Sequence, residues 1–290
     1  QSSAASDVYK RQGSGWVVDA GYKMPDVFAH YRGVYSIPHG QFVDVNGDGL
    51  VDWVQAYHAS TETAKQKTWL NTGSGWDDNN SYTLPELIYD NLSGWNDVSP
   101  VTHGQFLDVN GDGLRDWVRS YETVGGATHK AVRLNTGDGW GVVNAGFAAP
   151  PFAHINHRYS SFERGWPLNI RGNYIDLNGD GLVDYAQSYK TSATGFKEYK
   201  NAWINNGSAW VEDSSYAPTD LHYDYSGREN AKSDFGAYVD INNDGSPDWV
   251  VSRVGTTKIS RLTTTPRKDQ IEKIVTTLGV EVKPTLEPLT

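Results

Sequence analysis

A nine-residue acidic pattern occurs four times in this sequence and has the residue types of a calcium loop. The first copy runs from Asp44 to Asp52, and the others occupy 108–116, 176–184 and 240–248. Each copy reads D-x-N-x-D-G-x-x-D, which puts side-chain oxygens at positions 1, 3, 5 and 9 and glycine at position 6. Calcium prefers about six to eight oxygen ligands on a tightly turning loop. The pattern therefore predicts four Ca²⁺ ions.

The predicted ligands are the side chains at positions 1, 3, 5 and 9 and the backbone carbonyl at position 7. They are Asp44, Asn46, Asp48, Leu50 and Asp52; Asp108, Asn110, Asp112, Leu114 and Asp116; Asp176, Asn178, Asp180, Leu182 and Asp184; and Asp240, Asn242, Asp244, Ser246 and Asp248. An ordinary Asp/Asn/Gly turn is the alternative for any single copy. Repetition of the whole oxygen pattern favours calcium, because a turn needs only one or two such residues.

The loops are not EF-hands, because the bidentate Glu expected at position 12 is missing. That position holds Gln55, Arg119, Gln187 and Val251 in the four copies. The flanking segments are aromatic and β-branched, which indicates strands on both sides of the loop. Without the Glu, we expect modest affinity and sites that fill at extracellular calcium levels. The predicted location is therefore secreted or at the cell surface.

A second pattern repeats with the same period and indicates the elements that hold the loops. The first Asp of the pattern recurs at 44, 108, 176 and 240. An apolar run, an Asn-x-Gly turn and a Trp follow the first three loops over 69–76, 133–140 and 203–210, and 12–16 resembles the end of such a unit. This is a hairpin signal, and a later Pro suggests an outer edge strand. Repeats of this length predict an all-β protein, a partial β-propeller of about four blades. Each blade would have four antiparallel strands, with the calcium loop between its first two strands.

Glycines and aromatic residues occupy fixed places beside each loop. Gly40, Gly104, Gly172 and Gly236 precede the loops, and Trp53, Trp117, Tyr185 and Trp249 follow them. A glycine within a strand predicts a bulge or a close backbone approach. We expect the aromatic residues to form the core between blades.

Three segments are predicted along the chain. Residues 1–11 match nothing later and look like a foreign or disordered end, residues 12–252 form the propeller fragment, and residues 253–290 lead toward a further domain. The apolar residues within 271–279 also fit one face of a helix, so the sequence is compatible with either a strand or a helix in this tail. We find no signal peptide pattern and no apolar run long enough for a membrane span.

Composition excludes several functions. The net charge is −10, and the four loops hold three Asp each, so four bound Ca²⁺ would bring the charge to −2. Because the acidity belongs mostly to the loops and no basic stripe is present, nucleic-acid binding is not expected. The chain has no cysteine, which excludes disulfides and thiolate metal sites.

Few other residues suggest chemistry. His154 and His157, in the inserted segment 151–168, have metal-ligand spacing, but a solvated loop is the expected role. His39 and His103 repeat at one blade position, as do the Tyr-Asp pairs at Asp90 and Asp224, and repetition favours structural roles. We see no arrangement of nucleophile, His and acid, so a non-enzymatic protein is predicted.

The loops resemble the FG-GAP/VCBS calcium repeats of integrin-α-type propellers. Their pairing with 70–76, Leu-Asn-Thr-Gly-Ser-Gly-Trp, is similar to propellers of toxin-complex B components, SpvB-type virulence proteins and YD-repeat (Rhs/teneurin-like) secreted bacterial proteins. The resemblance implies a non-enzymatic scaffold from a large secreted protein, which docks other toxin or shell segments. A lectin-like or adhesive propeller that binds surface glycans is the alternative.

Overall fold

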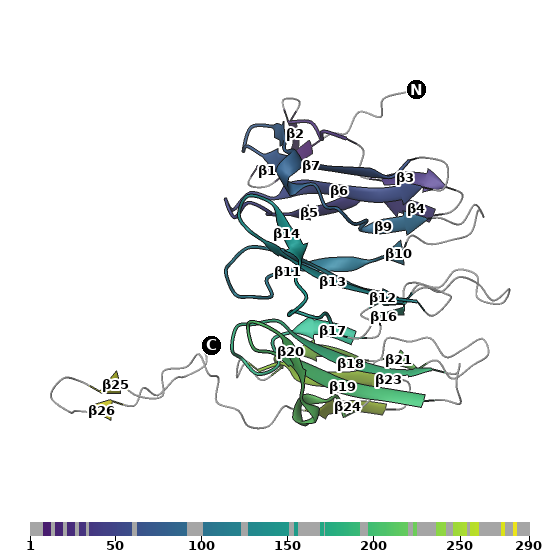
Figure 1. The fold of residues 1–290 in the computed structure, drawn as a ribbon, viewed down its shortest axis with the longest axis vertical. Helices are drawn as coiled ribbons and strands as arrows, with labels where there is room; N and C mark the ends of the chain where they lie inside the picture. Colours follow the sequence, from purple (N-terminus) through teal and green to yellow (C-terminus); the bar gives the residue numbers. More distant parts are fainter. Residues whose placement is uncertain are drawn as a thin grey trace. The chain divides into compact units, whose positions relative to one another are not determined.

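The computed structural model of this chain is all-β, apart from two short 3-10 helices in the described part (Figure 1). It describes residues 8–12, 15–19, 22–26, 29–32, 35–59, 63–91, 101–122, 127–150, 154–155, 169–170, 172–191, 197–219, 223–224, 236–241, 246–253, 256–260, 274–275 and 281–282. The helices are η1 (Asn80–Tyr82) and η2 (Ser214–Tyr216). Among these residues, no helix is both long and apolar enough to cross a membrane.

The chain divides into two compact units, Gln1–Asn169 and Ile170–Thr290. The strands of the first unit are β1 (Val8–Gln12), β2 (Gly15–Asp19), β3 (Ala29–Arg32), β4 (Tyr35–Pro38), β5 (Gly40–Val43), β6 (Asp52–Ala59), β7 (Lys65–Asn71), β8 (Trp76–Asp78), β9 (Tyr89–Asn91), β10 (Val101–Thr102), β11 (Gly104–Leu107), β12 (Asp116–Glu122), β13 (Thr128–Asn135), β14 (Trp140–Val143) and β15 (His154–Ile155); β16 (Asn169–Ile170) spans the boundary. Those of the second are β17 (Gly172–Ile175), β18 (Asp184–Thr191), β19 (Lys197–Asn205), β20 (Trp210–Glu212), β21 (Tyr223–Asp224), β22 (Gly236–Val239), β23 (Asp248–Arg253), β24 (Thr256–Ser260), β25 (Ile274–Val275) and β26 (Glu281–Val282).

Three sheets contain the predicted succession of four antiparallel strands. They are β5-β6-β7-β8, β11-β12-β13-β14 and β17-β18-β19-β20, and in each the acidic loop joins the first two strands. Strands β8, β14 and β20 end their sheets, as predicted for outer edge strands. The fold is thus all-β and propeller-like. The three sheets have the same strand order because in each of them the acidic loop reverses the chain between the first two strands.

The structure adds strands that the sequence pattern did not predict. Strand β9 pairs in parallel with the end of β6, β15 does so with β12, and β21 does so with β18. In each blade, the first strand pairs with the beginning of the second strand, and the added parallel strand pairs with the end of that second strand. His154 therefore lies in β15, not in the solvated loop that we expected, whereas His157 lies outside the described residues.

The fourth sheet differs from the prediction of four strands per blade. Its described strands are β22, β23 and β24, and β24 extends past the predicted boundary at residue 252. Among the residues described after the fourth loop, no counterpart of the Asn-x-Gly hairpin is present, because that sequence does not follow this loop. In the tail, Ile274–Val275 and Glu281–Val282 pair as antiparallel strands, so these described residues are not helical.

Part of the N-terminal segment is also paired. Strand β1 forms an antiparallel hairpin with β2, in which Arg11 lies opposite Trp16. Asn71 lies opposite Trp76 in the same way in the hairpin of β7 and β8. Residues 8–12 therefore correspond to the third strand of a blade, as β7 does in the first four-stranded sheet. The foreign origin of residues 1–11 stays a prediction.

The glycines that open the first strands are close to the neighbouring backbone, as predicted. A Cβ atom at Gly104 would lie 2.2 Å from the carbonyl oxygen of Val118, and one at Gly40 would lie 2.0 Å from that of Val54. Any side chain at these positions would push the paired strands apart. Glycine is therefore required by the close approach of the strand pair.

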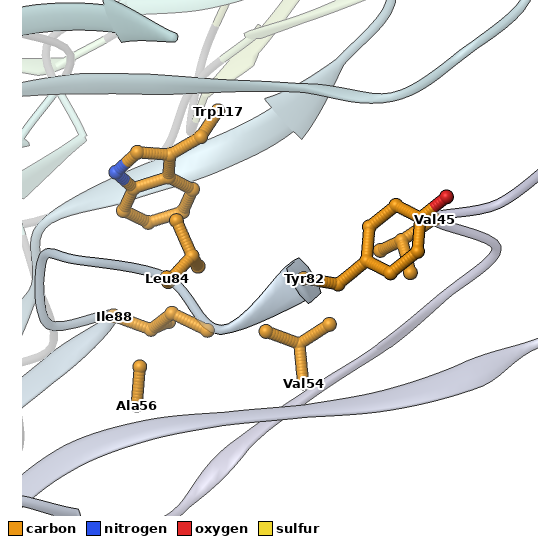
Figure 2. Packing of buried hydrophobic residues seen from close by; sticks show 7 residues of the cluster. All are labelled: Val45, Val54, Ala56, Tyr82, Leu84, Ile88 and Trp117. Carbon is orange, nitrogen blue, oxygen red and sulfur yellow. The ribbon is translucent and has the colours of Figure 1, made fainter. Parts of the chain in front are cut away.

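The core of the first unit lies between its first two four-stranded sheets. It contains Val45, Val54, Ala56, Tyr82, Leu84 and Ile88 from the first repeat and Trp117 from β12. Figure 2 shows the Trp117 ring beside Leu84. The predicted core aromatics Trp53, Trp117, Tyr185 and Trp249 are all buried. Burial of such rings is a major source of stability, and Trp117 also joins the first two repeats.

Polar contacts join the same two sheets. The Arg133 guanidinium donates to both carboxylate oxygens of Glu86 at 2.7 and 2.8 Å. The indole N–H of Trp140 donates to the Tyr82 carbonyl at 2.7 Å, and the Tyr82 hydroxyl donates to the Gly137 carbonyl. The hairpin that follows the second acidic loop is thus anchored on the first repeat.

Candidate calcium-binding loops

The first acidic loop is shaped by hydrogen bonds from its own backbone to its own side chains. The Asp44 carboxylate accepts the N–H groups of Gly47 at 2.7 Å and Gly49 at 2.8 Å. Both glycines have positive φ, 75° and 85°, which favours glycine. The backbone therefore favours glycine at position 4 as well as at position 6 in this loop. The aspartate at position 1 consequently sits at the centre of the turn.

The side chains at positions 3 and 5 hold each other in place. Asn46 Oδ1 accepts the Asp48 N–H at 3.1 Å, and Asp48 Oδ1 accepts the Leu50 N–H at 2.8 Å. The Asn46 amide also donates to Asp48 Oδ2 at 2.9 Å. The second and third loops repeat all five of these side-chain bonds. In each of these three loops, the predicted ligand residues at positions 3 and 5 are thus in direct contact.

The aspartate at position 9 has a different environment, because it is buried at the start of the second strand. Asp52 Oδ2 accepts the Val45 N–H at 2.9 Å, and Asp52 Oδ1 accepts the Asn71 N–H at 2.8 Å. Asp116 and Asp184 make the same two kinds of bond. This carboxylate therefore fastens the acidic loop to the Asn-x-Gly hairpin of its own sheet.

Sequence reasoning missed the part played by the hairpin asparagines, Asn71, Asn135 and Asn205. Each gives its backbone N–H to the position-9 aspartate, and its amide nitrogen donates to the carbonyl just before that aspartate. The sequence did contain a signal for this pairing, because the Asp and the Asn recur at a nearly constant separation of 19, 19 and 21 residues.

Burial and repulsion act together on the position-9 carboxylates. Burial raises the pKa of Asp116 to about 6 and that of Asp184 to about 7, and it also raises the pKa of Asp52. The two backbone N–H bonds lower each pKa, whereas the other two aspartates of the same loop raise it. The three carboxylates of a loop are therefore close enough to repel one another.

The donor set fits a hard cation chemically. Each loop offers three carboxylates, an amide oxygen and a backbone carbonyl, all oxygen donors of the kind that calcium prefers. A carboxylate oxygen that accepts one N–H keeps further acceptor capacity. In the described part of the chain, no group of three or more His, Cys, Asp or Glu side chains is arranged to hold a metal ion as it stands. The carboxylates would have to turn from the loop N–H groups for full coordination, and calcium stays a prediction.

The fourth loop is described only at its ends. Asp248 Oδ2 accepts the Ile241 N–H at 3.2 Å, which corresponds to the bond between Asp52 and Val45 in the first loop. Asp240, Ser246 and Asp248 are described, whereas Asn242 and Asp244 lie outside the described residues. The described ends follow the pattern of the other loops.

The repeated histidines have structural surroundings, as their repetition suggested. His39 stacks on Tyr57 at 3.8 Å between ring centroids, and His103 stacks on Tyr121 at 4.1 Å. Both histidines are buried. Asp90 and Asp224 lie in the parallel strands β9 and β21, not in loops, and occupy the same register in each.

Positions 5 and 9 of the second loop should respond differently to mutation. Asp116→Ala leaves the buried N–H groups of Val109 and Asn135 unpaired, so we expect a loss of about 2–4 kcal/mol in the free energy of unfolding with or without calcium. Asp112→Ala should change little in chelator, because its side chain is exposed, but should remove the calcium gain of that loop. Urea unfolding in both conditions measures this. Equal behaviour of the two variants in chelator would contradict it.

Comparisons with known proteins add little to this geometry. No protein-family model matches the sequence, and no curated protein matches it. A solved lectin from Agrocybe aegerita, described as recognising non-reducing terminal N-acetylglucosamine, is similar with a TM-score of 0.48 and 17% identity; the match covers 89% of this chain and 60% of that chain. This chain thus spans about 60% of the length of that lectin. A likeness at this level does not transfer a ligand or an activity.

Proposed function

We propose that this chain is a non-enzymatic, calcium-stabilised β-propeller fragment that serves as a docking scaffold. The observation that carries the proposal is the identical construction of three acidic loops, each of which gathers three mutually repelling carboxylates at the start of a hairpin. In the absence of metal this repulsion opposes folding. Bound calcium would supply the compensating charge, so that binding free energy becomes folding free energy.

Direct binding measurements test this proposal. Isothermal titration of the chelator-stripped chain with CaCl₂ should give about three or four ions per chain with dissociation constants of roughly 10⁻⁴–10⁻³ M, the range of extracellular modules. Asp48→Ala should remove about one ion, whereas Ser74→Ala, in the neighbouring hairpin, should remove none. Absence of binding at about 10 mM calcium would overturn the proposal, because a module of this class would be filled at that concentration.

An affinity in this range would favour a secreted or cell-surface location, because cytosolic calcium would leave such sites empty. The family resemblance supports a place in a large secreted toxin-complex or YD-repeat-type protein. The coding sequence next to this segment tests that origin. A downstream YD-repeat array would support it, and a flanking sequence that encodes unrelated cytosolic domains would contradict it.

Exposed apolar residues on edge strands support protein docking. Val142 and Val143 are 87% and 45% exposed on β14, and Val211 is 54% exposed on β20. Both strands end their sheets and offer backbone groups to a partner. A crosslinking experiment on the intact parent assembly tests this, since crosslinks from the β14 region to another segment are expected and their absence there would contradict it.

A glycan-binding function receives less support from the described surface. Sugar binding by a propeller would need repeated exposed aromatic residues, yet Phe42 is the one exposed aromatic ring among the side chains whose burial the structure describes. The repeated rings of Trp53, Trp117 and Tyr185 are buried. A glycan array should therefore show no binding, and a reproducible hit would favour the lectin alternative.

A further inference from the structure

The first two acidic loops are connected through one buried side chain of the second sheet. Asn135 Nδ2 donates to the Val45 carbonyl oxygen at 2.6 Å, although the two residues are 90 positions apart. Val45 lies in the first loop, and its N–H donates to Asp52 Oδ2 at 2.9 Å. Val45 and Asn135 are both buried. Asn135 therefore reaches from its own hairpin to the backbone that fixes the position-9 aspartate of the first loop.

The backbone of the same asparagine is bound to the second loop. The Asn135 N–H donates to Asp116 Oδ1 at 2.7 Å, and Asp116 Oδ2 accepts the Val109 N–H at 2.9 Å. Three hydrogen bonds and the covalent bonds within Val45 and Asn135 thus connect Asp52 to Asp116. Both ends of this path are position-9 carboxylates, which are predicted calcium ligands.

A second, independent contact joins the loops. A Cβ atom at Gly47 would lie 2.8 Å from Cδ2 of Leu114. Gly47 is at position 4 of the first loop, and Leu114 is at position 7 of the second loop, where the backbone carbonyl is a predicted ligand. The Leu114 side chain therefore lies directly against the turn of the first loop. A change in the shape of either loop alters this packing.

We propose that Asn135 is a positioning residue that couples calcium binding at the first loop to calcium binding at the second. The inference rests on the proposed function and adds a regulation of the same sites. When the second loop is ordered, Asp116 is held in place and its hydrogen bond positions the Asn135 backbone. The Asn135 side-chain amide is then held against the Val45 carbonyl. This contact favours the ordered conformation of the first loop. Because such coupling is reciprocal, each loop should raise the affinity of the other by the same factor.

The test uses the full chain with the third and fourth loops silenced by Asp176→Ala, Asp180→Ala, Asp240→Ala and Asp244→Ala. In this two-site background, each remaining loop is silenced in turn by Asp48→Ala or Asp112→Ala, and calcium affinity is measured by titration calorimetry. We expect the intact pair to bind its second ion about three- to tenfold more tightly than a lone loop binds its single ion. Asn135→Ala should reduce this factor toward one.

Thr136→Ala is the matched control. Thr136 is the next residue of the same hairpin, and its hydroxyl donates to the Gly139 carbonyl at 3.1 Å. That bond is local to the hairpin, so the coupling factor should remain as in the two-site parent. If Asn135→Ala fails to fold, Leu114→Ala provides the second variant, because it removes the packing on Gly47 and leaves the backbone carbonyl at position 7. This variant should lower the coupling factor too.

The outcomes separate the two proposals. Calcium affinities that are measurable but independent of the neighbouring loop would overturn the coupling and leave the calcium scaffold intact. Unchanged coupling in a folded Asn135→Ala variant, or in Leu114→Ala where Asn135→Ala does not fold, would overturn the assigned path. Lack of any calcium binding in the two-site parent and in the unaltered chain would overturn both proposals.

Discussion

Calcium at about 10 mM should raise the main melting temperature of this chain by about 10 °C or more over its value in chelator. The reason is mass action, because an ion that binds only the folded loops stabilises them. At roughly ten to a hundred times the dissociation constant, one site contributes about 1.4–2.7 kcal/mol. Three loops would add about 4–8 kcal/mol, and each kcal/mol is worth about 2–4 °C in a domain of roughly this size.

Differential scanning calorimetry measures this effect. Magnesium at the same concentration is the ionic control, and it should raise the melting temperature less, because it requires near-octahedral coordination and gives up its water reluctantly. A variant with Asp48→Ala, Asp112→Ala and Asp180→Ala should lose most of the calcium gain. Equal melting temperatures in calcium and chelator would contradict the proposed stabilisation.

Replacement of Trp117 by Ala should cost about 3–5 kcal/mol of the free energy of unfolding, the range for a buried large aromatic side chain. Trp117 is fully buried, and its ring packs with Leu84 and Ile88 of the preceding repeat. The loss therefore combines a cavity with a weakened joint between two sheets. Urea denaturation in chelator measures it without a contribution from calcium.

Trp117→Phe is the informative control for this prediction. The indole nitrogen of Trp117 is buried without a hydrogen-bond partner, so replacement by Phe removes no hydrogen bond. Phe keeps most of the apolar contact, and we expect a loss below about 1.5 kcal/mol. Val142→Ala, on an exposed edge strand, should be close to neutral. Similar losses for the Ala and Phe variants would mean that the ring does not stabilise the joint through packing.

The repeat and the local shape of the loops could be read from the sequence. The Asp44 bonds to Gly47 and Gly49 and the Asp48 bond to Leu50 span two to five residues. Such short-range contacts depend on residue type and spacing alone, which is why position 6 glycine and the odd-numbered oxygens were informative. The glycine at Gly104 and the buried ring of Trp117 were also predictable, since each recurs at one place in a repeated strand.

The links between repeats were decided by tertiary structure. Asp52 meets Asn71 only because strands β6 and β7 pair in one register. Asn135 meets Val45 only because two sheets pack face to face around Trp117. The parallel strand β9 was likewise not visible in the pattern. The sequence by itself determined where oxygen donors occur and how each loop turns, because those interactions are local. Which loops touch, and through which asparagine, follows from packing between segments far apart in the chain.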